Sequence, residues 1–394
     1  MTSISFHEKI ALILSFLILN NYLFLSLSFP QLLIKINFLI FLLTVLIFYF
    51  KNFLENPFLK IFFLFIIFIS LGTPVFEWDA RSIWLFHAKR IFFDGSIFSV
   101  SDNYAKFSQN DLPNLIPAFS ASLGFLLGYW NEVFPKLSFS LAFLPPLIFI
   151  YPFLKNTNYL IFLSIIFFII GKYLFSGWAD GLLAVYFGIS AFLMYIFFIE
   201  RFDFYRRKTF FYLTAICFFS SLTLIKNEGV VLLLILFVTV FLIKIYKGEL
   251  KKYILNIALL LLAFLPIVMW KFFCFSKGIA YSHFINTNTL FNLLSRITDL
   301  KNYGQISYFL FLNEKFLISL VFLSVSFWLN RNMQLFRFIF IAIIMYIIVL
   351  FFVYLSTPYD FYWQLNSTAA RVSKTLSFSL AFFGLYNLNN YRIR

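Results

Sequence analysis

Residues 58–93, "FLKIFFLFIIFISLGTPVFEWDARSIWLFHAKRIFF", decide the fold class because an apolar run passes directly into a mixture of charges and tryptophans. The run over 58–75 is close in length to a helix that crosses a membrane, which needs about 20 residues. Glu77 and Asp79 follow at its end. Such a cluster is either part of a reaction site or an amphipathic segment lying on a membrane.

The composition indicates an integral membrane protein. The chain has 394 residues, of which 62% are hydrophobic and 12% charged, and its mean hydropathy is +0.91. Soluble domains carry about 25% charged residues. The net charge of +15 does not indicate a nucleic-acid partner, because the basic residues occupy short turns where membrane orientation accounts for them. The two cysteines lie in apolar segments and imply no disulfide framework.

Apolar runs of about 20 residues predict an all-α fold of 12–13 transmembrane helices. They form a single polytopic domain over 1–394, without a soluble domain or an internal repeat. The first run is too long for the apolar region of a signal peptide, so we expect it to remain as a span. The predicted spans are 11–29, 31–50, 58–75, 113–130, 135–154, 158–176, 180–199, 209–226, 229–246, 253–275, 306–329, 335–355 and 372–388.

Charge bias orients these spans. Four turns are basic, so we expect them to be cytoplasmic; they hold Lys51 and Lys60; Arg201, Arg206, Arg207 and Lys208; Lys244, Lys247, Lys251 and Lys252; and Arg331 and Arg337. The other connections then face outward, including 76–112 and 277–304. Asp79 and Asp180 both fall outside, although three apolar segments separate them. One segment must therefore cross only partly, and the stretch with Pro145, Pro146 and Pro152 is the expected one.

The outward loop 76–112 is predicted to contain an interfacial helix. Ala80, Ile83, Trp84, Ala88 and Ile91 recur at helical spacing, which favours a helix along the outer surface with its tryptophans at headgroup depth. This interpretation explains the lysine and arginine at 89 and 90. It does not explain the carboxylates at 77 and 79, because carboxylates at that depth need a partner or a chemical role.

Three further groups of polar residues stand at outer helix ends, each with two interpretations. Asp180 either caps the helix that follows or lines a site, where Gly177 would allow close approach. Lys226 and Glu228 form either a tight turn with a local ion pair or part of a shared cavity. Arg371 either extends toward the interface or holds an anionic partner, and guanidinium suits phosphate.

Motifs of other enzyme classes are absent from the sequence. The three histidines, His7, His87 and His283, show no metal-ligand spacing, and HExxH, GxSxG and P-loop patterns do not occur. Soluble-type hydrolysis and nucleotide-driven transport are therefore disfavoured.

Five short motifs follow one another over about residues 70–375. They are "WDARSIWLFHAK" (78–89), "DLPNLIPAF" (111–119), "GWAD" (177–180), "IKNEG" (225–229), and "TPYDFYWQL" (357–365) followed by Arg371. In this order they resemble bacterial members of the GT-C type glycosyltransferases. These polytopic enzymes use polyprenyl-phosphate-linked sugars and include protein O-mannosyltransferases and the aminoarabinose transferase of lipid A. The chain departs from the pattern at Gln364, where relatives often carry histidine, and around Pro113 and Pro117, where a tyrosine is missing.

The resemblance implies an inverting glycosyltransferase in the bacterial cytoplasmic membrane, acting at its outer face. Its partners would be a polyprenyl-phosphate sugar donor, membrane lipid, and a glycan, lipid or protein acceptor. Asp79 would be the general base. A glycosyl phosphate already carries a good leaving group, so one carboxylate and phosphate-side cations suffice. Arg371 and then Lys226 would bind the phosphate, and Asp180 and Glu228 would orient hydroxyl groups or help to hold a divalent cation if this branch uses one. The full set expected to bind substrate or phosphate is Arg371, Lys226, Asp180, Glu228, Glu77 and Gln364.

Three alternatives remain open. A transporter or flippase of lipid-linked glycans would show ionisable residues near mid-span and repeat symmetry. A polysaccharide polymerase or ligase would carry arginines in a large late outer loop, whereas 277–304 holds only Arg296. A structural role follows if Asp79 faces lipid. The enzyme hypothesis predicts that Asp79, Asp180, Glu228 and Arg371 converge on one outward cavity within roughly 10–15 Å.

Overall fold

The computed structural model of the chain describes residues 4–51, 57–98, 106–200, 208–279 and 287–390, in which all regular structure is helical. Arg201, Arg206, Arg207 and His283 lie outside these ranges. The helices are α1 (Phe6–Ser26), α2 (Gln31–Phe50), α3 (Pro57–Gly72), η1 (Ala80–Trp84), α4 (Leu85–Asp94), η2 (Lys106–Ser108), α5 (Leu115–Leu127), α6 (Val133–Ala142), α7 (Leu144–Ile150), η3 (Tyr151–Phe153), α8 (Asn156–Ile170), η4 (Gly171–Leu174), α9 (Asp180–Phe198), α10 (Lys208–Ile225), α11 (Asn227–Tyr246), α12 (Leu250–Leu260), η5 (Leu261–Phe264), α13 (Leu265–Ser276), α14 (Thr287–Ile297), α15 (Leu300–Phe311), α16 (Glu314–Leu329), α17 (Met333–Ser356) and α18 (Phe361–Asn389).

The chain is an all-α protein with several helices that can span a membrane. Each of the thirteen predicted spans coincides with a helix or with consecutive helices. Within the described ranges, however, nine are long and apolar enough to cross, or ten if α15 and α16, which meet at 77°, count as one. The prediction of 12–13 exceeded this number because α3 has 16 residues, α5 has 13, and α18 carries polar residues in its first half.

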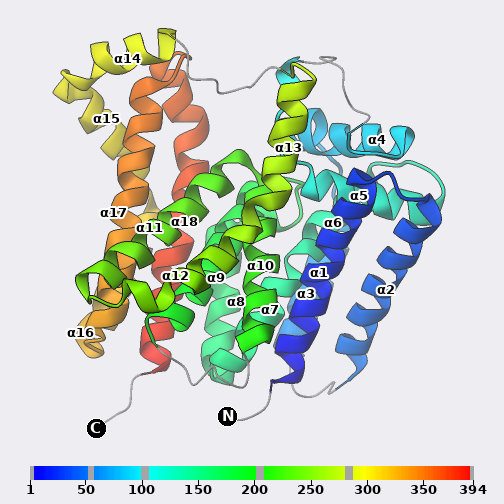
Figure 1. The fold of residues 1–394 in the computed structure, drawn as a ribbon, viewed down its shortest axis with the longest axis horizontal. Coiled ribbons are helices and arrows are strands. Elements are labelled where there is room, and N and C mark those ends of the chain that lie inside the picture. The colour runs from blue at the N-terminus through cyan, green and yellow to red at the C-terminus, as the bar shows by residue number, and fades with distance from the viewer. Residues whose placement is uncertain (1–3, 52–56, 99–105, 201–207, 280–286, 391–394) are drawn as a thin grey trace.

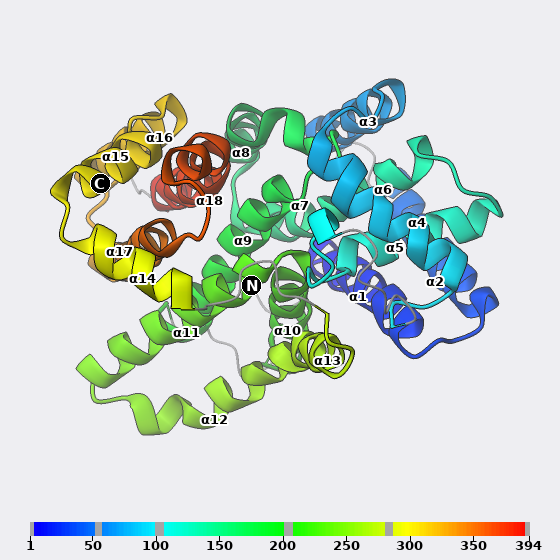
Figure 2. The ribbon, with the colours of Figure 1, turned by 90° about the horizontal axis from the view of Figure 1, so that it is seen from above.

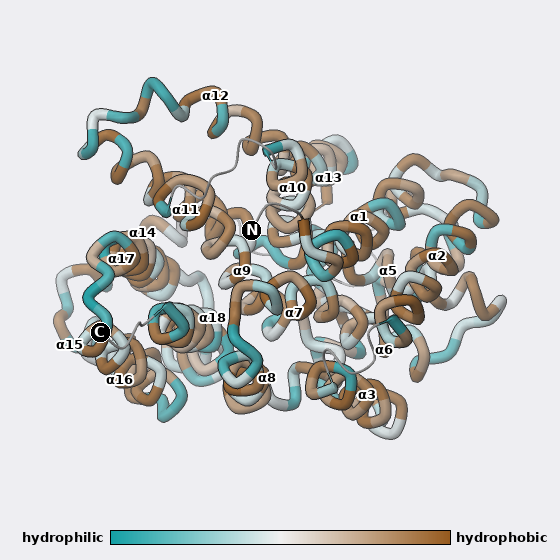
Figure 3. Tube along the Cα trace, turned by 90° about the horizontal axis from the view of Figure 1, so that it is seen from below, coloured by the Kyte–Doolittle hydropathy of each residue, from teal (hydrophilic) through white to brown (hydrophobic). Residues whose placement is uncertain are grey.

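The helices form an upright bundle with two distinct ends (Figure 1). At one end α4 and α14 lie across the bundle; we call this the α4 end. At the opposite end, the terminal end, lie the start of α1 and the ends of α2, α16 and α18. Seen from above, α1–α7 occupy one side and α14–α18 the other, with α9 between them (Figure 2). Hydrophobic residues dominate the helices, and hydrophilic ones gather at turns and helix ends (Figure 3).

The segment that fails to cross is α5, and not the proline-containing segment. Val133–Phe153 forms a 21-residue candidate span, because the prolines of α7 fall in its first turn, where a missing N–H costs little. In contrast α5 is about 20 Å long. Both of its flanks meet α4: the carbonyl of Ser108 bonds to His87, and Trp130 packs on Phe92. The chain thus enters and leaves α5 at the α4 end.

The amphipathic helix of the loop 76–112 exists, but protein covers its apolar stripe. All five stripe residues, Ala80, Ile83, Trp84, Ala88 and Ile91, are buried, and α4 packs on α5. Phe92 adds a ring contact with Phe125 of α5, with centroids 5.1 Å apart. Lys89 points outward. The prediction that this stripe lies on lipid was therefore wrong, since periodicity shows an apolar face but not what covers it.

Candidate functional site

Asp79 is held in place by a close contact between two loops. It precedes η1, a π-helical turn in which Ala80 is completely buried. Gly177 lies against Ala80: a Cβ atom on Gly177 would be 3.1 Å from that of Ala80 and 3.5 Å from Cγ of Lys136. The backbone φ of Gly177 is +85°, a conformation that also favours glycine. The "WDA" and "GWAD" motifs therefore fit together only with glycine at 177, and they place Asp79 beside Trp178.

Asp180 is the first residue of α9, yet its side chain is not a helix cap. Oδ1 accepts a hydrogen bond from Nζ of Lys226 at 3.0 Å, and Oδ2 accepts one from Nη2 of Arg371 at 3.0 Å. Both oxygens of this buried carboxylate thus bind cations. The packing of α9 on α18 sets the register, because Gly188 lies against the ring of Phe378, which a Cβ atom would meet at 2.6 Å. Both contact residues lie about two turns beyond the ion pair.

Lys226 is the only residue between α10 and α11, so its side chain projects from the tip of the hairpin. Its Nζ also lies 3.1 Å from Oε1 of Glu228. Burial alone would lower the pKa of Lys226, but the carboxylates of Asp180 and Glu228 outweigh burial and raise it. The local ion pair expected of a tight turn is present between Lys226 and Glu228. Lys226 also binds Asp180, which lies 46 positions away in the sequence.

Arg371 closes the arrangement. Its Nη2 donates to Oδ2 of Asp79 as well as to Asp180, and its guanidinium lies 4.6 Å from the ring centroid of Trp178. We call Asp79, Asp180, Lys226, Glu228 and Arg371 the ion-pair cluster. Both bonds use Nη2, and a guanidinium has five N–H donors, so Nε and Nη1 take no part in them.

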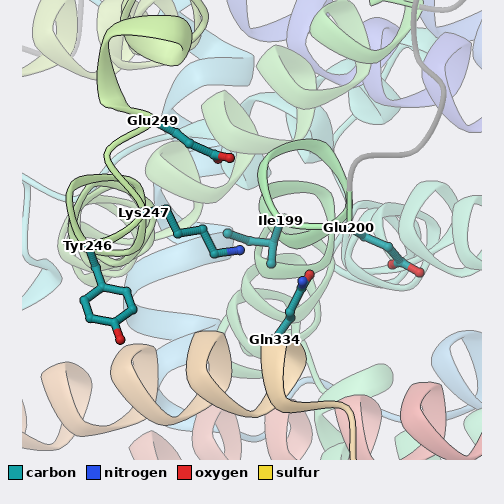
Figure 4. Close-up of a pocket in the computed structure, with 6 residues that line it drawn as sticks. All are labelled: Ile199, Glu200, Tyr246, Lys247, Glu249 and Gln334. Carbon is teal, nitrogen blue, oxygen red and sulfur yellow. The ribbon is translucent and has the colours of Figure 1, made fainter.

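The predicted convergence of these side chains is confirmed. Four segments more than 40 residues apart bring them into direct contact, and the cluster stays partly open to solvent: the side chain of Glu228 is 46% exposed and that of Arg371 21%. The outward cavity that these side chains were expected to share stays a prediction. A cavity of about 680 Å³ lies at the other end of α9 and is lined by Ile199, Glu200, Tyr246, Lys247, Glu249 and Gln334 (Figure 4). No residue of the cluster lines it.

Two predicted residues lie beside the cluster and not within it. Glu77 binds Lys172 of η4, with Oε1 and Nζ 2.6 Å apart. Gln364 lies two turns before Arg371 on α18 and is partly exposed. Its side chain makes no hydrogen bond with the cluster among the residues that the structure describes.

Sequence reasoning missed a group of cations and aromatic rings around Arg371. Lys172 lies 5.3 Å from the ring centroid of Trp178, and Trp178 packs edge-on against Tyr173. Lys374, one turn beyond Arg371, is 8% exposed and lies 4.6 Å from the centroid of Tyr173. Among the described residues no carboxylate lies within ion-pair distance of Lys374; the charges of Lys315, Lys172 and Arg371 repel it, and Asp180 attracts it from a longer distance. The sequence did contain a signal for Lys374, because a lysine within a predicted span is unusual and needs an explanation.

Asp111 was also missed, although its motif was recognised. Its buried carboxylate accepts a hydrogen bond from Asn227 of the "IKNEG" turn at 3.0 Å and lies 3.4 Å from Nζ of Lys271. The same lysine and Trp270 donate to its backbone carbonyl. The contact joins the start of α5 to the hairpin that carries Lys226. The lysine within the apolar run of α13 was a usable signal.

The described side chains do not fit a divalent cation. No group of three or more histidine, cysteine, aspartate or glutamate residues among them is arranged to hold a metal ion. The carboxylates of Asp79 and Asp180 instead share Arg371. We therefore derive no step through a metal.

The chain matches no family model, and no curated protein and no solved structure matches it. The resemblance to GT-C glycosyltransferases accordingly rests on the five motifs and their order.

Proposed function

We propose that the chain is an inverting glycosyltransferase of the GT-C type that uses a polyprenyl-phosphate sugar. The observation that carries the proposal is the contact of Arg371 with both Asp79 and Asp180. It unites three of the five motifs, from positions up to 292 residues apart. A carboxylate and cations within one partly open cluster are the groups that this transfer requires.

In the proposed reaction, the Asp79 carboxylate accepts the proton of the acceptor hydroxyl or amine. The acceptor atom forms a bond to the anomeric carbon as the bond from that carbon to the phosphate oxygen breaks. The electron pair leaves with polyprenyl phosphate, and the configuration at the anomeric carbon inverts. Asp79 is poised for this role because its ion pair with Arg371 holds it beside a cation that we assign to the leaving group.

We assign phosphate binding to N–H groups near the cluster that make no ion pair with its carboxylates. Nε and Nη1 of Arg371 are not used in its ion pairs, and Lys374 has no carboxylate partner among the described residues. The indole N–H of Trp178 is buried and has no hydrogen-bond acceptor there. Unsatisfied buried donors in native proteins are uncommon, and these would all suit an anion. Lys226 is less suited to bind phosphate, because its ammonium group is already paired with two carboxylates.

The location of the cluster supports an enzyme more than a transporter. Asp180 and Lys226 stand at helix ends, whereas a transporter site is expected near mid-membrane. Because basic turns lie at the terminal end, we place the α4 end outside the cytoplasmic membrane of a bacterium. The acceptor would then be a glycan, lipid or protein at that surface.

The test uses proteoliposomes of the purified chain and a polyprenyl-phosphate sugar labelled in the sugar. A glycosyltransferase releases polyprenyl phosphate and transfers the label to acceptors from a membrane extract. A flippase moves intact donor across the bilayer. Intact donor after incubation with several sugars and extracts, together with its movement across the bilayer, would overturn the proposal in favour of transport.

A further inference from the structure

The two helices that lie across the α4 end have opposite polarity. In α4 most apolar side chains are buried against the protein, with Phe93 an exception at 67% exposed, and Lys89 and Asp94 face outward. In α14 the polar side chains face the protein instead. Asn292 donates to the carbonyl of Thr357, and Arg296 donates to the same carbonyl at 2.9 Å. The Arg296 guanidinium also lies 5.4 Å from the ring centroid of Phe361.

The outward face of α14 is apolar. Leu290, Phe291, Leu294 and Ile297 are 53%, 71%, 70% and 46% exposed, and Leu300, at the start of α15, is 83% exposed. Residues 290, 294 and 297 follow one another at helical spacing and therefore share one side of the helix. A continuous apolar face of this kind is unfavourable in water, and here the helix binds the protein through its polar side.

The surroundings of α14 indicate what covers this face. Its bonds to Thr357 place it directly beyond the end of α17, a candidate span that ends at Ser356. The turn before α18 and the first turn of this helix expose three aromatic side chains at this level, Tyr359, Tyr362 and Trp363. Tyrosine and tryptophan concentrate where a membrane meets water. In addition, α14 packs on α17, and the last turns of α17 expose further apolar side chains, such as Phe352 and Val353.

We propose that α14 lies in the boundary layer of the bilayer, with Leu290, Phe291, Leu294 and Ile297 inserted among lipid acyl chains. Its partner is thus the lipid surface, and Arg296 ties it to the junction of α17 and α18. The connection 277–304, which the sequence presents as an aqueous loop, then contains a membrane-inserted helix. At the same end, α4 faces water.

The test measures the surroundings of spin labels attached to single cysteines in proteoliposomes. In a background with Cys217→Ala and Cys274→Ala, labels are placed at Leu294→Cys and Leu290→Cys. Lys89→Cys on α4 is the aqueous control, and Ile348→Cys, exposed on α17, is the lipid control. Collision rates with oxygen, which concentrates in lipid, and with a water-soluble nickel chelate are compared.

The oxygen-to-nickel ratio at 294 and 290 is expected to match that at 348 and to exceed that at 89 severalfold. A ratio at both α14 positions equal to that at 89 would overturn the proposal. The two α14 positions guard against one poorly folded variant, and circular dichroism checks that each labelled protein keeps its helix content. The outcome does not depend on whether the chain transfers sugar.

Discussion

Arg371 is the residue on which the ion-pair cluster depends, because among the described residues it is the one that binds both Asp79 and Asp180. Arg371→Met would leave two largely buried carboxylates without their shared partner. Breaking a buried ion pair typically costs about 3–5 kcal/mol. Since the side chain is 21% exposed, we expect the lower part of that range, seen as a reduced melting temperature in detergent.

The matched control for that variant is Arg90→Met. Arg90 lies 3.6 Å from Asp94 on α4, and their side chains are 32% and 26% exposed. A partly exposed ion pair contributes less than a buried one, so the melting temperature should fall less than it does for Arg371→Met. Equal shifts for the two variants would contradict a special role of Arg371 in the fold.

Lys374 should affect donor binding without supporting stability. Lys374→Met removes a buried charge that has no carboxylate partner among the described residues, so the melting temperature should stay level or rise. A hydrogen bond to a charged group contributes about 1.5–3 kcal/mol, so we expect the KM for the donor to rise about tenfold or more. Lys301→Met, exposed on α15, is the control. An unchanged KM would remove Lys374 from the phosphate site.

His87 makes the stability of the fold dependent on pH. Burial lowers its pKa below the usual 6.5, although a hydrogen bond with the carbonyl of Ser108 opposes this. The unfolded chain therefore takes up a proton as the pH falls through about 6.5, while the folded chain resists it. Stability is then lost on acidification, by at most about 1.4 kcal/mol per pH unit. The difference in melting temperature between wild type and His87→Gln should stay constant above about pH 7 and shift against the wild type toward about pH 5; parallel curves over the whole range would refute this.

At the scale of elements, α5 is the feature that determines the topology. It starts after Pro113 and ends at Gly128, which has a φ of +81°, so its apolar run cannot extend into a full span. Cysteines at Phe107 and Tyr129, both exposed, should react with an impermeant maleimide from the same side of the membrane. A cysteine at Lys155, in the turn before α8, should react from the other side. Labelling of 107 and 129 from opposite sides would show that α5 crosses.

Elements could be predicted from the sequence more securely than their surroundings. Apolar runs located every candidate span, because length and composition determine where a helix can lie in a membrane. The apolar runs did not distinguish α5 from a span. Pro113 before the helix and Gly128 after it limit its length without changing the hydropathy of the run. Likewise, the periodicity of α4 located its apolar face, but only its packing on α5 showed that protein covers it.

At the scale of the whole molecule, the order of motifs predicted which residues meet, and the structure joins five of them through ion pairs. The sequence allowed this because each residue stood at a helix end on the same side by charge bias. It could not reveal Lys374 or Asp111. Their importance depends on neighbours from distant helices, such as Tyr173 and Asn227.

The central claim is that Asp79 removes a proton from the acceptor, and Asp79→Asn tests it most directly. The asparagine keeps the shape of the side chain and can still accept a hydrogen bond from Arg371, so donor binding should remain. A positioned general base contributes about 10²–10⁴-fold to rate, and we expect sugar transfer in proteoliposomes to fall by about that factor. Asp94→Asn, with the same change on the exposed face of α4, should keep full activity. Retained turnover in Asp79→Asn would contradict the account.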